Sequence, residues 1–278
     1  MNHRQRPFFR FAMKTLIMLL CAGLLPLLHT GASAQAAPVV GNQIRPLLIN
    51  NQYVLFPGKL APYIQEGKLM IPVRAFAGAL GAQLTYDAAT KSSTISLLGE
   101  SVGKLRAGQA TAVTRDGSKI ALGVSPQLRD GVLFAPMNPI LTGLKKLKWE
   151  NMYNALTRHV LIVQGRGDME LPQPKSWQSV TSFGDVPGEH QNPFYPTLLT
   201  QSADGKGFRL SLSVLNASGS VIPKGASSLE FIAVNGQGQA VVRQLPGPSQ
   251  ATPKAGALSF TINVPTAPDY VIFNSRIK

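Results

Sequence analysis

An approximate internal repeat constrains the fold of this chain more than any other feature of its sequence. Residues 66–87, EGKLMIPVRAFAGALGAQLTYD, share a pattern with residues 130–150, DGVLFAPMNPILTGLKKLKWE. Each segment starts with an acidic residue and Gly, passes through a short apolar run and a Pro into an amphipathic stretch, and ends with an aromatic residue and an acid. Because such self-similarity marks a structural unit that occurs more than once, the pattern predicts a duplicated module.

The positions that the two copies share are those that folding requires. Most recur at an offset of 64 residues, and one residue is lost before the last matches. They are apolar residues or turn formers, whereas Arg74 becomes Asn138 in the second copy. We therefore interpret the shared set as structural and not catalytic. The matched pairs are Pro62 and Pro126, Gly67 and Gly131, Pro72 and Pro136, Leu80 and Leu144, Leu84 and Leu147, Tyr86 and Trp149, and Asp87 and Glu150.

The first copy also predicts the order of its elements. Leu69–Ile71 is a short apolar strand candidate, and Pro72 suits the first turn of a helix, where its missing N–H needs no partner. Apolar residues at helical spacing follow up to Gly81, which supplies a helix stop. Residues 83–87 and 93–98 are then predicted to be strands. The expected fold class of this half is α+β, a duplicated small ββαβ-type module.

The N-terminal segment predicts export. Four basic residues lie within the first 14 positions, an apolar run covers 15–28, and A-x-A patterns follow at 32–36. This order is that of a signal peptide, expected at residues 1–36. The alternative is an uncleaved membrane anchor, but the apolar run is shorter than the roughly 20 residues that cross a bilayer. Cleavage is therefore favoured, and no membrane span is expected in the mature chain. The only cysteine, Cys21, would leave with this segment, which excludes disulfides and thiolate metal ligands from the mature chain.

The first copy of the repeat resembles a known family. Its motif, GKLMIPVRAFA at 67–77 with LGA at 80–82 and LTYD at 84–87, is similar to the copper amine oxidase N-terminal domain-like module, also called the stalk domain. The similarity spans about residues 43–164 and is more specific in the first copy than in the second. The resemblance implies a small α+β unit that occurs in tandem on secreted and surface proteins of bacteria. In that family the module is a non-catalytic appendage.

The resemblance does not extend to the oxidase chemistry in the family's name. That enzyme needs a tyrosine in an Asn-Tyr-Asp/Glu setting for its quinone cofactor and three histidines for copper. This chain has NMYN at 151–154, without an adjacent Asn-Tyr pair, and only His159 and His190 follow the signal segment. We therefore expect tandem stalk modules without the oxidase catalytic domain, no cofactor and no metal site.

The C-terminal part of the chain predicts a different class of structure. Residues 166–193 are rich in Gly, Pro and polar side chains and are expected to form a linker between a tandem stalk-like domain at 43–165 and a further domain at 194–278. Short alternating segments separated by turn signals favour an all-β, Ig-like sandwich for that last domain. The predicted strands are 197–200, 207–215, 228–234, 239–244, 257–264 and 270–275.

Positive charge gathers in the repeat half. Residues 36–167 hold 15 Lys and Arg against 6 Asp and Glu, whereas residues 168–278 hold 8 against 7. Outside the cytoplasm such a field can attract anionic cell-wall polymers or an acidic partner, although it can also serve solubility alone. The candidate binding residues are Lys145, Lys146, Lys148 and Arg74. No specific nucleic acid partner is expected.

The sequence gives little support for an enzymatic function. The one compact candidate for a hydrolytic triad is Ser182, Asp185 and His190 in the linker, and no Gly-x-Ser-x-Gly motif surrounds any serine. We expect a chain that is not an enzyme, acting as an exported or envelope-associated binding or scaffold protein whose basic half contacts an anionic envelope polymer or a partner protein. The alternative is an accessory or inhibitory module that docks on an extracytoplasmic enzyme.

Overall fold

The computed structural model describes residues 44, 46–49, 52–97, 100–114, 116–137, 140, 149–153, 161–165 and 192–278. All of them belong to one compact unit, Val40–Lys278. The predicted signal peptide, residues 166–191 of the predicted linker, and the lysines at 145, 146 and 148 lie outside the described residues.

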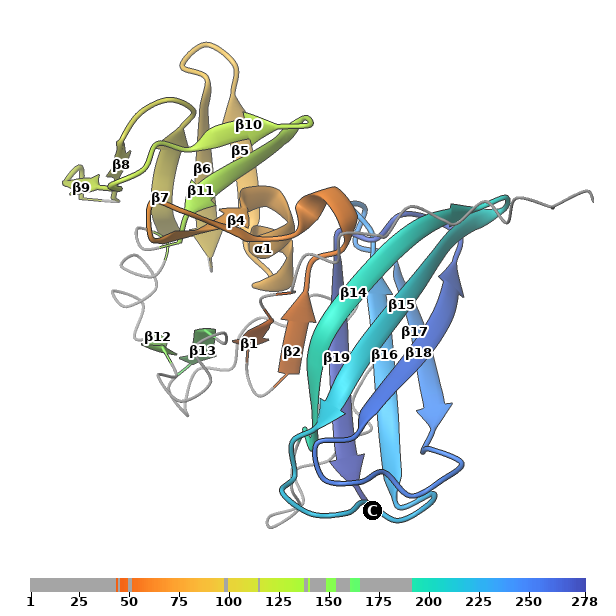
Figure 1. The fold of residues 1–278 in the computed structure, drawn as a ribbon. Coiled ribbons are helices and arrows are strands. Elements are labelled where there is room, and N and C mark those ends of the chain that lie inside the picture. Colours follow the sequence, from red (N-terminus) through yellow and green to blue (C-terminus); the bar gives the residue numbers. More distant parts are fainter. Residues whose placement is uncertain are drawn as a thin grey trace, which may run out of the picture. The chain divides into compact units, whose positions relative to one another are not determined.

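The described residues form four β-sheets (Figure 1). The largest has the order β12 (Trp149–Tyr153), β13 (Leu161–Gly165), β1 (Leu47–Ile49), β2 (Gln52–Leu55), β19 (Tyr270–Ile277), β16 (Ser227–Val234) and β17 (Ala240–Pro246). The second has the order β10 (Gln127–Arg129), β11 (Val132–Pro136), β4 (Lys68–Pro72) and β3 (Tyr63–Gln65). The third contains β14 (Phe194–Asp204), β15 (Gly207–Asn216) and β18 (Ala257–Val264). The fourth has the order β5 (Gln83–Asp87), β6 (Ser92–Leu97), β7 (Glu100–Arg106), β8 (Thr111–Val113) and β9 (Lys119–Ala121).

Helical structure is minor in the part of the chain that the structure describes. A 3-10 helix, η1, covers Gly58–Leu60, and the α-helix α1 covers Val73–Ala79. The expected succession of strand, Pro and helix is confirmed, since β4 leads directly into α1 and Pro72 is the N-cap. With seven residues α1 is about 10 Å long, so it connects sheets and does not cover one.

The predicted fold class, an α+β ββαβ-type module followed by an Ig-like sandwich, is wrong. The protein is mostly β. The elements of the expected module follow one another along the chain, but β3 and β4 lie in one sheet while β5 pairs with β6 in another. Nor do the C-terminal strands form a self-contained sandwich, because β19 pairs with β2 and joins its sheet to the N-terminal half. Local periodicity predicted β4, α1 and β5, whereas the pairing of β4 with β11 and of β5 with β6 decided which sheet each strand entered.

The two repeat segments meet in the second sheet. β4 and β11 pair antiparallel, and Ile71 lies opposite Ala135, the residue 64 positions further along the chain. The hairpin turns also match: Glu66 and Gly67 have φ of 48° and 71°, and Asp130 and Gly131 have φ of 48° and 76°. Two consecutive positive φ angles are typical of the tight I′ hairpin turn, whose twist suits the flanking strands. The sheet therefore contains two equivalent hairpins arranged about an approximate two-fold axis.

The hydrophobic core crosses from the repeat half into the C-terminal strands. Phe76 and Leu80 of the α1 region share one cluster of buried side chains with Ile232, Tyr270 and Ile272. A second cluster joins residues of β2 to residues of β14, β15, β16, β18 and β19. Each half consequently supplies part of the apolar surface that the other half buries.

Candidate binding groove

Two adjoining cavities lie beside α1, and they share Arg74, Leu84 and Asp269 as lining residues. The larger, of about 780 Å³, is called here the α1 groove. The smaller, of about 510 Å³, is called the loop cavity. Both are bounded by residues of the repeat half and of the C-terminal half, so the pairing of β2 with β19 is what brings their walls together.

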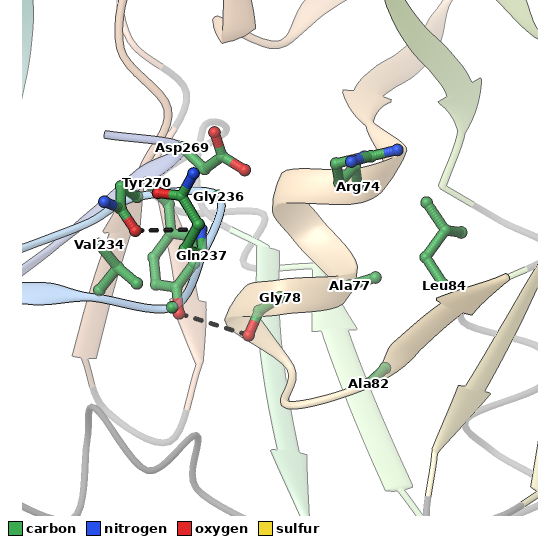
Figure 2. A pocket seen from close by; sticks show the side chains of 12 residues that line it. Arg74, Ala77, Gly78, Ala82, Leu84, Val234, Gly236, Gln237, Asp269 and Tyr270 are labelled. Carbon is green, nitrogen blue, oxygen red and sulfur yellow. Dashed lines mark hydrogen bonds between the residues drawn. The ribbon is translucent and has the colours of Figure 1, made fainter. Parts of the chain in front are cut away.

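The loop cavity lies between α1 and the loop that follows β16 (Figure 2). On one side the helix contributes Ala77 and Gly78, and on the other side Tyr270 begins β19. The Tyr270 hydroxyl donates a hydrogen bond of 3.4 Å to the Gly78 carbonyl. A Cβ on Gly78 would lie 3.4 Å from Cε1 of Tyr270, which is the short limit of ordinary van der Waals contact, so helix and ring are closely packed here.

One asparagine holds the loop wall of this cavity. The Oδ1 atom of Asn235 accepts hydrogen bonds of 3.0 Å from the backbone N–H groups of Gln237 and Gln239. Its Nδ2 atom donates to the side chain of Gln239 at 2.9 Å and to Thr266 at 3.2 Å. An Asx-type network of this kind fixes the backbone before any ligand arrives, which lowers the entropic cost of binding.

Apolar side chains form most of the wall of the α1 groove. Tyr86 on β5 is 60% exposed and Leu128 on β10 is 68% exposed, although both are large enough to bury substantial apolar area. β5 is an outer strand of its sheet, and β10 is an outer strand of another. The remaining apolar lining residues are Pro57, Leu60, Ala75, Leu84, Ala107, Val132, Leu133, Ala267 and Pro268.

Positive charge exceeds negative charge around this groove. Lys59, Arg74 and Lys91 line it, against one carboxylate, Asp269. Burial raises the pKa of the Asp269 carboxyl, and the charges of Arg74 and Lys59 oppose that rise. Lys59 donates a hydrogen bond of 3.3 Å to the backbone carbonyl of Asp130, which directs its ammonium group toward the β10–β11 turn. An anionic group that enters the groove would meet an excess of cations.

The predicted binding residues have different outcomes. Arg74, expected from the sequence, lines both cavities. The lysines at 145, 146 and 148 lie outside the described residues, so their part in binding stays a prediction. Sequence reasoning missed Lys59, Lys91 and Leu128, which lie far apart in the chain and carry no shared motif. Tyr86 was assigned to the structural set, but its exposure places it on the groove surface.

Asp87 stabilises the turn that follows β5. Its Oδ1 atom accepts hydrogen bonds from the backbone N–H groups of Ala89 at 2.9 Å and Thr90 at 3.2 Å, and Oδ2 accepts from the Thr90 hydroxyl at 2.6 Å. These bonds, led by that of the Thr90 hydroxyl, lower the pKa of Asp87. They fix the β5–β6 turn, on which Lys91 stands beside the groove.

Among the described residues, no group of three or more His, Cys, Asp or Glu side chains is placed to hold a metal ion. The residues of the candidate triad, Ser182, Asp185 and His190, lie outside the described residues, as does His159. Within the part of the chain that the structure covers, no helix is long and apolar enough to span a membrane.

Comparison with known proteins supports the resemblance seen in the repeat. Residues 48–157 match the family model described as the copper amine oxidase N-terminal domain. In that family this domain is non-catalytic. No curated protein matches the chain. No solved structure matches it either. The family match ends before β14, so it lies in the repeat half and does not include the C-terminal strands.

Proposed function

We propose that this chain is an exported, non-enzymatic binding or scaffold protein of the cell envelope. The observation that carries the proposal is the α1 groove, where Lys59, Arg74 and Lys91 surround apolar walls with one opposing carboxylate. A surface of this kind attracts anionic ligands and desolvates apolar ones, and it needs no catalytic group to do so. The matched family domain is non-catalytic, which is compatible with this role.

In this proposal, the repeat half arose by tandem duplication of the stalk module. Support comes from the equal offset of the matched residues, the shared turn conformation, and the pairing of Ile71 with its counterpart Ala135. Ile140 adds to this, since it is helical and buried at the position 64 residues after Phe76, which is also helical and buried. The duplication supplies a framework, and the binding residues that differ between the copies stand on its surface.

The ligand of the basic half is an anionic polymer of the envelope or an acidic partner protein. The charge balance supports this half as the electrostatic contact, with 15 basic against 6 acidic residues in 36–167 and nearly equal numbers in 168–278. The signal-peptide pattern at residues 1–36 supports an extracytoplasmic location, secreted or attached to the envelope. No catalytic domain, cofactor or metal is part of the proposal.

A sedimentation assay tests this function. Purified mature protein is mixed with isolated cell walls at rising salt, and the bound fraction is measured. We expect binding that weakens with salt, because screening shortens the reach of surface charges. A triple Lys→Glu variant at 145, 146 and 148 should release the protein at lower salt than wild type. The matched control carries Lys→Glu at 206, 224 and 254, which are exposed in the C-terminal half, and should bind as wild type. Absent or salt-insensitive binding would refute the electrostatic role.

The alternative function is an accessory or inhibitory module that docks on an extracytoplasmic enzyme. Exposed apolar side chains at Tyr86 and Leu128 favour it, because such residues suit a protein surface better than a hydrated polymer. Co-purification from envelope extracts discriminates between the two. A stoichiometric enzyme whose activity changes when this chain is added supports the accessory role, whereas retention by the cell wall without a protein partner supports the first proposal.

A further inference from the structure

The α1 groove has a composition that selects one class of ligand. We propose that it binds an extended peptide segment of a partner protein that carries apolar side chains alternating with carboxylates. This inference rests on the proposed binding function and names the ligand class of the site. Its two requirements, an apolar wall and a rim of cations, come from side chains on separate sheets and loops.

The apolar wall accounts for the apolar half of the peptide. Tyr86 and Leu128 are more than half exposed, while Leu84 and Leu133 are partly buried beside them. Aliphatic side chains that enter this groove would remove its walls from water, and burial of apolar surface favours association. With about 780 Å³ of volume, the groove has room for several side chains of a short segment.

The cations that line the groove are the expected partners of the carboxylates of the peptide. Arg74 is exposed on α1 and Lys91 is exposed on the β5–β6 turn, so both can meet a carboxylate at the rim. Lys59 stands on η1, tied to the Asp130 carbonyl. The opposing carboxylate, Asp269, lines the same groove and already balances part of the charge of Arg74 and Lys59. A peptide with alternating carboxylates and apolar residues places the two kinds of side chain on opposite sides of its backbone when extended.

The backbone of the peptide can pair with the outer edge of β5. β5 is the outer strand of its sheet among the described strands, and four of its five residues are exposed. The outer edge of such a strand offers N–H and C=O groups that an added strand can pair with. Main-chain pairing along β5 would carry the peptide past Leu84 and Tyr86, which line the groove.

An acidic glycan fits this lining less well. Sugar hydroxyls need many hydrogen-bond donors and acceptors around them. The only uncharged hydrogen-bonding side chains among the described residues that line the groove are those of Tyr86, Ser93 and Gln201. Aliphatic walls would leave most hydroxyl groups of a sugar without partners. The same walls are complementary to leucine, valine or phenylalanine side chains.

Fluorescence polarisation with labelled synthetic peptides tests the proposal. The probe is a fluorescein-labelled peptide of alternating glutamate and leucine, compared with a glutamate–serine peptide and a lysine–leucine peptide of equal length. The glutamate–leucine peptide should bind saturably, and each of the others at least tenfold more weakly. The double variant R74E/K91E should weaken its binding by about tenfold, and L128S should weaken it several-fold. The control variant K206E, on the exposed β14–β15 turn, should bind as wild type.

Each other outcome overturns the proposal. No saturable binding, equal binding of the lysine–leucine peptide, or unchanged binding by R74E/K91E would refute it. Displacement of the peptide by alginate, a polymer of uronic acids, at lower concentration than by unlabelled peptide would assign the groove to an acidic glycan instead. Circular dichroism of each variant checks folding, and these side chains are exposed enough that their replacement should leave the melting temperature unchanged. Wall binding in the sedimentation assay without peptide binding would refute this inference alone, and the reverse would refute the wall-binding function alone.

Discussion

Ile272 tests whether the two halves of the chain fold as one cooperative unit. It is the third residue of β19, is fully buried, and is paired with Val54 of β2 on one side and Ile232 of β16 on the other. It belongs to the same hydrophobic cluster as Phe76 of α1. Truncation of this side chain therefore removes contacts that reach into the repeat half.

The expected cost follows from burial. Ile272→Ala deletes three side-chain carbons from a fully buried site, and such changes lower the free energy of unfolding by about 2–5 kcal/mol. A loss of about 3 kcal/mol corresponds to a fall of roughly 6–12 °C in melting temperature for a unit of this size. Ile272→Val should cost about 1 kcal/mol. The control Val221→Ala changes a side chain that is 58% exposed and should cost less than about 0.5 kcal/mol.

Hydrogen exchange measured by mass spectrometry locates the effect. If the halves unfold together, Ile272→Ala should speed exchange in peptides from β4 and α1 as much as in peptides from β16 and β19. In every region, the increase in exchange rate should be largest for Ile272→Ala, smaller for Ile272→Val and smallest for the control Val221→Ala. Retained protection in β4 and α1, with loss confined to β16 and β19, would show that the halves unfold independently and that the shared core adds no coupling.

Three further predictions concern turns and titrating groups. Gly67→Ala and Gly131→Ala should each lower the free energy of unfolding by about 1 kcal/mol in urea titrations, because alanine is strained at the positive φ of these positions. A Cβ would meet open space at both, so no steric clash adds to this cost. Unequal losses would contradict equivalent hairpins. The pKa of Asp269 is raised in the folded state, so its contribution to stability is greatest below its ordinary pKa of 3.8 and falls as pH rises through the folded value. Asp269→Asn should abolish this fall when the free energy of unfolding is measured by urea titration at several pH values. An unchanged dependence of that free energy on pH would contradict the burial of this carboxyl. Burial, with a smaller effect of Tyr195, raises the pKa of Tyr53 to about 12, so an alkaline absorbance titration should show a last ionisation step that Tyr53→Phe removes; full titration near pH 10 in the folded protein would contradict it.

Much of the local structure could be predicted from residue order. The predicted strand 257–264 matches β18 at both ends, and 207–215 differs from β15 by one residue at its C-terminal end. Alternation of apolar and polar side chains is a property of neighbours in the chain, so it survives without knowledge of the fold. The acidic residue and Gly at the start of each repeat segment, which served in the sequence only to align the two segments, lie in hairpin turns with positive φ.

The candidate site could be predicted only in part. Arg74 was named from the repeat half, and it lines both cavities. Its neighbours in the groove, among them Lys59, Leu128 and Asp269, come from positions up to 210 residues apart, and nothing in the sequence links them. Tyr86 shows the limit most clearly, because its match to Trp149 indicated a structural position while its ring is largely exposed.

The sequence by itself determined the spacing of the two similar segments, the glycines at their starts and the surplus of positive charge in the first half. These depend on spacing, on backbone conformations that Gly favours and on a count of side chains. The tertiary structure decided the rest: β2 pairs with β19, and β5 leaves the sheet of β4. The β2–β19 pairing is long-range, and its stability comes from apolar surface that the two halves bury jointly. The groove exists where those halves meet, so its residues became a site only after folding.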